Sequence, residues 1–561
     1  MWRQARRYGA LAFWYLSEAL LTLFKRRPAY GILKLRLAGD LAEEPIEYRL
    51  LGLSRRSRGD YFSWVALLRW ARDDPHVRAV FVCCEELHAG WAKVQELHRG
   101  LRSLRDAGKT VWVHLAHAGI HEYVLAAAAD RVLLPPSGTL GVVGLSSEVT
   151  FVAGALEKLG VEAEVVHMGK YKSAAEIFTR TEMSEPHREM VESLVHDLYE
   201  QIVDLIATGR RMDRTQIHTL LGSGPFVARE AQRVGLIDAL LYEDEAEEQL
   251  GTQCDHAAII ETADYSSRRS KLVRRDVLRR GGAAIGLLNI SGTVKTGESI
   301  PGPESASACG AAAVARDLKE IRERDDVGAL VVRISSPGGS GLASDLIWHE
   351  VVRTRQRKPV VVSFGDVAAS GGYYVGVAGS PVLAEAGSIT GSIGVVAGKA
   401  LLRGLYDRLG VTKQVVNQGR HAALYSDYVP LGDEGRRLLQ NEAEFFYTDF
   451  VQKVAAGRQL SETAVAAAAE GRVWTGRQAH ALGLVDQLGG LEQALDEAKV
   501  LIGRAPGELV AVERYPKPKR PWRLSLQLNP PFTQWTAGLP WLHFLSGEHV
   551  WAVLPFHFRF F

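Results

Sequence analysis

Short apolar runs alternate with helical patterns of a dozen residues or more along most of this chain, and the whole alternation occurs twice. Each half opens with a strand-like stretch that ends in a glycine turn, at 32–39 and at 285–292. Continuous apolar runs that predict strands follow in matching order, at 77–84, 110–115 and 161–169 in the first half and at 327–334, 359–364 and 411–419 in the second. Such runs are typical of strands covered on both faces, so the pattern predicts an α/β fold with mainly parallel sheets.

The internal repeat divides the chain into domains, and its period is far too long for a solenoid. We expect an N-terminal segment, a first domain, a basic linker, a second domain and an aromatic tail, at 1–28, 30–251, 252–283, 284–503 and 504–561. The alternation of Phe with His and Arg at 556–561 predicts a half-buried strand. Three positions are open for the tail: against its own body, on a neighbouring subunit, or at a bilayer interface.

Composition narrows the classes of function. With 561 residues, 47% of them hydrophobic, the chain can bury large cores, and a net charge of +2 argues against binding to nucleic acid. Four cysteines show neither zinc-ligand spacing nor a disulfide framework. Cys83 and Cys84 lie in an apolar run and are expected to be buried thiols.

The N-terminal segment predicts contact with a membrane. Residues 8–24 form a mostly apolar run at the lower limit for spanning a bilayer, with basic residues on both sides. Glu18 lies inside the run, and a carboxylate at mid-membrane is costly. The run therefore permits either a spanning helix or an amphipathic helix on the surface. No small-residue cleavage site follows it, which favours a retained anchor.

The two halves differ at two positions that could carry chemistry. The stretch 359–396 repeats the pattern of 109–146, but Ser370, in GDVAASGGYY, matches Ile120. Further along, Lys172, in GKYKSAAE, matches Ala422 of the second half. One half keeps a serine and the other keeps a lysine. A duplicated fold that shares one Ser/Lys site between its halves would show this reciprocal loss.

Ser370 has the surroundings of a nucleophile. It follows a predicted buried strand and precedes two glycines, so the amide of Gly371 can point toward an oxyanion. The glycine-rich stretch SSPGGSG at 335–341 follows the preceding strand, and the carboxyl ends of adjacent parallel strands line one crevice. Gly338 or Gly339 is therefore expected to supply a second oxyanion amide.

A nucleophilic serine needs a base. The histidines of the second half, His349, His421 and His480, are candidates, and His421 adjoins the position that matches Lys172. Lys172 is favoured because of the reciprocal loss: it lies in the half that has no serine at the position of Ser370, as a site shared between the halves requires. Its pKa would have to fall from about 10.4 by roughly 2–3 units, which burial can achieve. Ser392, in GSITGSIGV, could hold the amine in place.

These motifs, in this order, resemble the long, duplicated form of the signal peptide peptidase A (protease IV) family, within the Clp protease/crotonase superfamily. The resemblance covers roughly residues 30–500 and implies tandem crotonase-like domains in a membrane-anchored serine protease that degrades leftover signal peptides. It implies Ser370 as nucleophile, Lys172 as general base, Ser392 as the residue that holds the lysine, and the amides of Gly339 and Gly371 as the oxyanion hole. It also implies a homo-oligomer with an enclosed cavity, placed at the cell membrane with its body on the extracytoplasmic side.

Two alternatives remain at this point. The crotonase architecture also serves acyl-CoA chemistry, in which a carboxylate often acts as base, and Asp366 and Glu385 lie near Ser370 in the sequence. A catalytically inactive membrane scaffold is the other alternative. The Ser/Lys mechanism requires no metal or nucleotide, and the chain has no Walker-type phosphate loop.

Overall fold

The computed structural model describes residues 30–44, 47–50, 53–56, 60–300, 307–517 and 550–553. The expected membrane helix at 1–28 and most of the aromatic tail, including the strand expected at 556–561, lie outside these residues. In the described part of the chain, no helix is both long enough and apolar enough to cross a membrane.

Each half is built on its own parallel sheet. The six strands of the first sheet run in the order β10 (Ala239–Leu240), β6 (Arg131–Leu134), β5 (Thr110–Leu115), β4 (Ala79–His88), β1 (Tyr30–Asp40) and β11 (Ala258–Glu261). All of their pairings are parallel. Cys83 and Cys84 lie in β4 as buried free thiols, as the sequence predicted.

The second sheet repeats this order through β22 (Gln487–Leu488), β18 (Val382–Ala384), β17 (Val360–Ala369), β15 (Val327–Ser336), β12 (Ala284–Ser291) and β23 (Val512–Tyr515). Two further strands, β19 (Ile389–Gly391) and β21 (Val473–Thr475), extend from β17. Only the β19–β21 pairing is antiparallel among these strands. The mainly parallel, duplicated α/β architecture is therefore confirmed.

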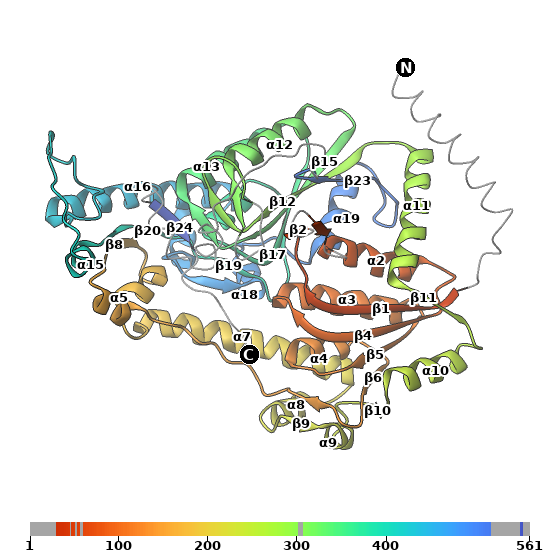
Figure 1. Cartoon of the computed structure of the whole chain (residues 1–561). Coiled ribbons are helices and arrows are strands. Elements are labelled where there is room, and N and C mark those ends of the chain that lie inside the picture. The colour runs from red at the N-terminus through yellow and green to blue at the C-terminus, as the bar shows by residue number, and fades with distance from the viewer. Residues whose placement is uncertain are drawn as a thin grey trace.

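Helices fill the space between and around the two sheets. The first half contributes α2 (Tyr61–Asp73), α3 (Trp91–Asp106), α4 (Ile120–Ala126), α5 (Ala153–Leu159), α6 (Glu176–Thr179), α7 (Glu185–Arg210), α8 (Arg214–Leu221), α9 (Ala228–Arg233) and α10 (Glu243–Gln253). The second contributes α12 (Ala311–Glu323), α13 (Gly341–Arg355), α14 (Gly371–Gly376), α15 (Arg403–Leu409), α16 (Gly432–Arg458), α17 (Glu462–Ala468), α18 (Gly476–Ala481) and α19 (Leu491–Leu501). Figure 1 shows α2, α3 and α19 where the two halves meet, and α3 contacts both β5 and β17.

The largest buried hydrophobic cluster includes residues of both halves, and a second cluster lies within the second half. Leu33 of β1, Leu101 of α3, Leu287 of β12 and Val331 of β15 belong to the same buried cluster and are all completely shielded from solvent. Burial of apolar surface is the main favourable term in folding, so the two halves stabilise each other rather than folding as separate bodies.

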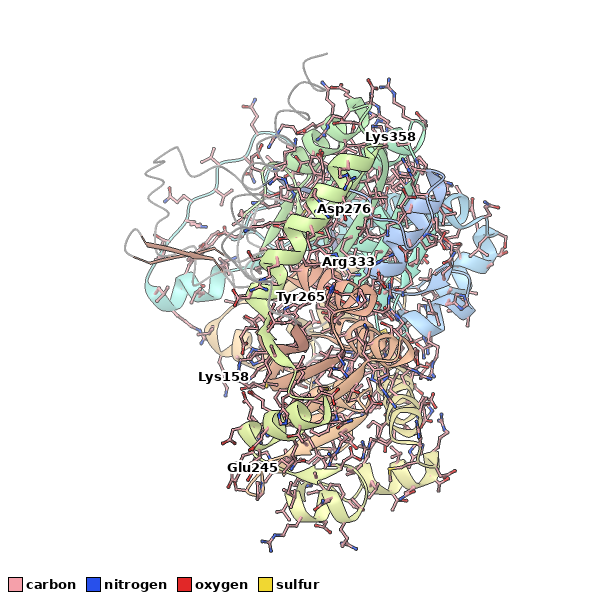
Figure 2. All side chains as sticks on the ribbon, turned by 90° about the vertical axis from the view of Figure 1, so that its right-hand side faces the viewer. Lys158, Glu245, Tyr265, Asp276, Arg333 and Lys358 are labelled. Atoms are coloured by element: carbon pink, nitrogen blue, oxygen red, sulfur yellow. The ribbon has the colours of Figure 1, made fainter. Side chains whose placement is uncertain are left out.

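The segments on either side of the predicted domains join the sheets. Strand β11 lies in the predicted linker and pairs with β1, and β23 lies in the predicted tail and pairs in the same way with β12. The linker continues as helix α11 (Thr262–Arg280). Figure 2 shows α11 running from the strands of the first half, near Tyr265, to the elements of the second half, near Asp276.

A third sheet crosses from one half to the other. Its order is β14 (Ala308–Gly310), β13 (Thr293–Lys295), β16 (Gly338–Ser340), β24 (Val550–Val553), β20 (Val395–Leu401) and β8 (Glu162–Met168). Strand β8 comes from the first half and pairs antiparallel with β20 of the second. Figure 1 shows β8, β20 and β24 side by side, away from the two parallel sheets. A short hairpin of β2 (Glu47–Leu50) with β3 (Leu53–Arg56) and an antiparallel pair of β7 (Thr139–Leu140) with β9 (Phe226–Val227) complete the strands.

The prediction of a strand at 411–419 is wrong. Residues 411–418 form no regular structure and are mostly exposed, whereas their counterpart in the first half is β8. A strand needs a ladder partner, and both edges of β20 are already taken, one by β8 and the other by β24. The apolar pattern alone could not reveal that competition.

Buried charges fix the junction between the halves. Arg333 of β15 is 1% exposed and donates to Glu43 of the first half at 3.0 Å and to the carbonyl of Phe364 at 2.7 Å. Figure 2 labels Arg333 near the middle of the view, between Tyr265 and Asp276 of the linker helix in height. Lys93 of α3 lies 3.3 Å from Asp366, which also accepts from the Lys93 amide at 3.0 Å. Because unpaired buried charges are costly, these contacts specify one docking of the halves.

Candidate active site

Ser370 lies at the turn between β17 and α14. Its backbone has φ 52° and ψ −116°, a conformation that costs a non-glycine residue about 1–3 kcal/mol. The surrounding structure holds it there: its N–H donates to the Gly391 carbonyl at 2.8 Å, and its own carbonyl accepts from Tyr374 at 2.8 Å. The strained turn aims the side chain out of the strand, as nucleophilic serines at strand-to-helix turns require.

The glycine loop at 335–341 packs against this turn. A Cβ on Gly372 would lie 2.8 Å from the Ser336 carbonyl oxygen, so only glycine allows the close approach. A Cβ on Gly339 would lie 1.9 Å from the Val294 carbonyl oxygen, which excludes any side chain there. The N–H of Gly338 donates to the Ser336 hydroxyl at 3.1 Å and is therefore already engaged. The N–H of Gly371 belongs to the first turn of α14, whose amides have no partner inside the helix.

Lys172 reaches this turn from the other half of the chain. The β8–β20 ladder ends with Met168 opposite Val395, and the chain then turns at Gly169, with φ 102°. A short 3-10 helix, Ser173–Ala175, follows Lys172. The ladder thus places Lys172 next to Ser370 and Ser392 of the second half.

Three oxygen atoms surround the lysine amine. Nζ of Lys172 lies 2.8 Å from Oγ of Ser370, 2.9 Å from Oγ of Ser392 and 3.2 Å from the Ser392 carbonyl oxygen. The side chains are enclosed, since Lys172 is 2% exposed and both serines are 0% exposed. The structure therefore brings together the serine, the lysine and the second serine that the sequence singled out.

Burial controls the charge of the lysine. In the described residues Lys172 has no carboxylate partner, and burial lowers the pKa of its amine well below the ordinary value. A neutral amine carries two N–H groups and one lone pair, whereas the charged form has three donors and no acceptor. The environment favours the form that can accept a proton.

A loop of the second half holds the lysine in place, and no local pattern in the sequence predicted this role. A Cβ on Gly471 would lie 2.5 Å from Cβ of Lys172, and the Tyr171 N–H donates to the Glu470 carbonyl at 2.8 Å. The same loop accepts from the Ser392 N–H through the Arg472 carbonyl at 2.7 Å. Residues 470–472 therefore set Lys172 and Ser392 relative to each other. A glycine in a polar loop carries no signal that separates this role from an ordinary turn.

The guanidinium of Arg472 adds to this clamp. It lies 4.7 Å from the Tyr171 ring and 4.5 Å from the Trp474 ring, and it pairs with Glu189 of the first half at 2.6 Å.

The other candidate groups are engaged elsewhere. His421 is 41% exposed at its side chain and lies 3.7 Å from Glu434, and His349 and His480 are exposed on α13 and α18. Asp366 accepts from the Gly90 and Lys93 amides, and Glu385 pairs with Arg99. The two carboxylates thus hold the halves together, and among the described residues the histidines make no contact with Ser370.

The comparison with known families decides what this chain is. The sequence profile of Peptidase family S49 matches residues 103–256 and 353–503, once in each half. The chain belongs to this family. It is a serine protease, which sets aside both the acyl-CoA enzyme and the inactive scaffold.

Relatives of this S49 peptidase cover most of its length. Serine protease SPPA, chloroplastic, of Arabidopsis thaliana is 32% identical over 84% of this chain and 69% of its own. Protease 4 of Haemophilus influenzae is 29% identical over 79% of this chain and 73% of its own, and Protease 4 of Salmonella typhi is 29% identical over 84% and 78%. Among solved structures, a ClpP1 mutant of Listeria monocytogenes aligns over 37% of this chain and 94% of its own length, at 12% identity and a TM-score of 0.25.

The buried lysine should leave a signature in stability. In the unfolded chain the pKa of Lys172 is about 10.4. In the folded chain its pKa is lower. Between these two pH values the unfolded chain holds one more proton, so the folded state gains stability as pH rises. Lys172→Met, which keeps the length and removes the charge, should raise the melting temperature, most at the acidic end of the window.

Thermal unfolding followed by circular dichroism across neutral to alkaline pH tests this. Lys158→Met, at an exposed lysine of α5, is the matched control and should show no such trend. A gain for Lys172→Met that is the same at every pH would contradict a depressed pKa.

Proposed function

We propose that this serine protease cleaves peptide bonds with Ser370 as nucleophile and Lys172 as general base. The observation that carries the proposal is the 2.8 Å contact between Nζ of Lys172 and Oγ of Ser370, both of them buried, with no carboxylate on the lysine among the described residues. A nucleophilic hydroxyl is weak by itself and needs an adjacent base within hydrogen-bond reach. The shared site also explains why each half of the repeat keeps only one of the two groups.

The hydrogen-bond pattern suits a neutral base. The two N–H groups of the amine donate to the hydroxyl and the carbonyl of Ser392, which leaves the lone pair for the hydroxyl proton of Ser370. Lys172 takes that proton as Oγ attacks the peptide carbonyl. The lysinium then gives the proton to the leaving amine, and water hydrolyses the acyl-enzyme by the same path.

Backbone amides would stabilise the oxyanion. The amides of Gly371 and Gly339 are the favoured donors, since Gly371 follows the nucleophile directly and Gly339 lies on the loop packed against it. Gly338 is the weaker candidate, because its N–H already donates to the Ser336 hydroxyl. Donors fixed in advance lower the barrier without reorganisation during the reaction.

Hydrophobic peptides are the proposed substrates, with cleaved signal peptides as the physiological class. Leu342 and Leu346, one turn apart on α13, are 52% and 46% exposed. Helix α13 starts directly after the glycine loop, so these leucines give the rim of the site an apolar face. An apolar rim favours apolar side chains in the peptide.

The dyad is tested with a fluorogenic hydrophobic peptide and detergent-purified protein. Lys172→Ala and Ser370→Ala should each lower kcat/KM by at least about 10²–10⁴-fold, which is the usual contribution of a general base. Because the pKa of Lys172 is lowered, kcat/KM should rise with pH as the amine loses its proton and be lost below that pKa.

Lys170→Ala, at a lysine that is 62% exposed two positions earlier, is the control and should keep wild-type turnover. A serine-directed acylating probe should label the wild type and not Ser370→Ala. Undiminished turnover by Lys172→Ala would refute the dyad.

We also propose that residues 8–24 attach the protease to the cell membrane and that its body lies on the extracytoplasmic side. The support is the apolar run with its basic flanks. In a liposome flotation assay the full chain should float with the vesicles, and a chain that starts at Tyr30 should stay at the bottom. Equal flotation of the two would refute the anchor.

A homo-oligomer is the proposed assembly. The first half uses β8 to pair with the second half, whereas the repeated segment 411–418 is exposed, with Val416 97% and Val415 43% accessible. If the β8–β20 contact were repeated between two copies, residues 411–418 of one copy would pair with the first half of the next copy. The contact would lie near Val143, which is 54% exposed. Such a head-to-tail contact closes into a ring when its rotation allows.

Light scattering after size-exclusion chromatography tests the assembly. Val416→Asp should shift the protein toward the monomer, because a carboxylate at an apolar contact is desolvated without a partner. Val227→Asp, at a valine that is 60% exposed elsewhere, should leave the mass unchanged. A monomeric wild type would contradict the assembly.

A further inference from the structure

Two short segments from opposite halves run side by side at the candidate site. Residues 169–172 belong to the first half and residues 470–472 to the second, and their backbones are hydrogen-bonded to each other. The guanidinium of Arg472 lies between two aromatic rings, 4.7 Å from the centre of the Tyr171 ring and 4.5 Å from that of Trp474. Only 16% of the Arg472 side chain is exposed, so packing fixes its place between the halves.

Glu189, on helix α7 of the first half, connects Arg472 with Tyr171. Its Oε1 accepts from Nη1 of Arg472 at 2.6 Å, and its Oε2 accepts from the Tyr171 hydroxyl at 3.0 Å. The bond from Arg472, and after it the bond from Tyr171, lowers the pKa of the Glu189 carboxyl, so this group stays charged at neutral pH. The three side chains therefore form a closed set in which each contacts the other two.

This set reaches the proposed base from two directions. Tyr171 directly precedes Lys172 in the chain, and the carbonyl of Arg472 accepts from the Ser392 N–H at 2.7 Å. The Ser392 hydroxyl in turn lies 2.9 Å from Nζ of Lys172. The side chain of Arg472 thus fixes the residue before the lysine, while its backbone fixes the serine beside the amine.

A second pair of charges joins the same segments but cannot set the position of the lysine. Lys170 and Glu470 lie 3.7 Å apart, and their side chains are 62% and 45% exposed. Ion pairs this exposed contribute little, because water competes for both charges. A guanidinium that is stacked on aromatic rings and paired with a carboxylate is held more firmly, since its planar group makes both kinds of contact at once. Arg472 is therefore the side chain that can fix the two segments.

The position of the amine decides its charge. Burial alone lowers the pKa of Lys172. Glu176, four residues along the chain, is bonded to Ser184 and His187 instead. In the described residues no titratable or charged side chain of the surrounding elements lies within hydrogen-bond distance of the Lys172 Nζ, and these side chains are Lys170, Tyr171, Glu176, Glu189, Glu470 and Arg472. A displacement that admits water would therefore raise the pKa of the lysine toward its ordinary value.

We propose that Arg472 is a positioning residue that keeps the amine of Lys172 beside Ser370 and away from water. It acts through Tyr171 and Ser392 and does not touch the reacting atoms. The proposal rests on the proposed function for the roles of Ser370 and Lys172. It adds that a charged side chain from the half with the serine holds the base that the other half supplies.

The kinetics of Arg472→Gln test the proposal. With the fluorogenic peptide, kcat should fall by about 10–10²-fold while KM stays close to the wild-type value, because a small misplacement of a catalytic group slows the chemical step. The acidic limb of kcat/KM, which reports the pKa of the base in the free enzyme, should move to higher pH as water reaches the amine. Arg472→Lys keeps the charge for Glu189 but not the planar stack, so it should retain part of the rate.

Arg477→Gln is the matched control. Arg477 of α18 pairs with Asp197 of α7 at 2.8 Å, and 38% of its side chain is exposed, so it too joins the second half to α7. Among the described residues its side chain pairs with Asp197 and Asp204 and with none of the residues that hold the amine. This variant should keep the wild-type kcat and pH midpoint. An equal shift of the midpoint in both variants, or no shift in Arg472→Gln, would overturn the proposal.

Glu189→Ala keeps the test decisive if the Arg472 variants do not fold. The Glu189 side chain is 54% exposed, so its removal leaves the buried core intact. Loss of the carboxylate releases the Tyr171 hydroxyl and one end of the guanidinium. The pH midpoint should therefore move in the same direction as in Arg472→Gln, by a smaller amount, and an unmoved midpoint would show that the amine does not depend on this set.

Thermal unfolding gives a readout that needs no turnover. The gain in melting temperature that Lys172→Met gives at the acidic end of the pH window should shrink in the Arg472→Gln background, because a lysine with a higher folded-state pKa costs less to bury there. A smaller gain in a protein without turnover would keep Arg472 as the residue that positions the lysine and would reject the dyad. Turnover with both the gain and the pH midpoint unchanged would keep the dyad and reject the positioning role.

Discussion

The antiparallel ladder between β8 and β20 is the contact on which the candidate site depends. It joins the two halves from Met168 opposite Val395 to Glu162 opposite Leu401. A slip by one residue would move the chain by about 3.3 Å, more than the tolerance of a hydrogen bond. Register in this ladder therefore decides whether Lys172 meets Ser370. The loop at 470–472 fixes the last step by contacting both Lys172 and Ser392.

A lysine without a counter-ion is costly to bury, and the rest of the fold has to hold it in place. The largest hydrophobic cluster includes residues of both halves, and buried pairs such as Arg333 with Glu43 specify how the halves dock. These contacts keep the amine away from water and away from carboxylates, which lowers its pKa and favours the neutral form that the proposed base requires. Stability far from the site thus sustains the reactivity of the site.

After the duplication, each half contributes different residues to the candidate site. Ile120 takes the place of Ser370 at the start of α4 and is 4% exposed, so it packs in the core where the other half has the proposed nucleophile. Ala422 takes the place of Lys172 in an exposed segment. Neither half can complete a Ser/Lys pair alone. The half without a serine still supplies β8, the lysine and the charges of the junction.

The sequence by itself determined the repeat, the parallel strands and the glycine-flanked Ser370, and it predicted that Ser370 meets Lys172, because local patterns and reciprocal losses carry that information. Tertiary structure decided the rest. Residues 411–418 lost their strand because β8 and β24 occupy both edges of β20. The Gly338 amide turned inward to Ser336, Gly471 became part of the lysine clamp, and 550–553 entered the third sheet. Each of these depends on which segments compete for the same backbone partner, and partners distant in the chain leave no mark on local sequence.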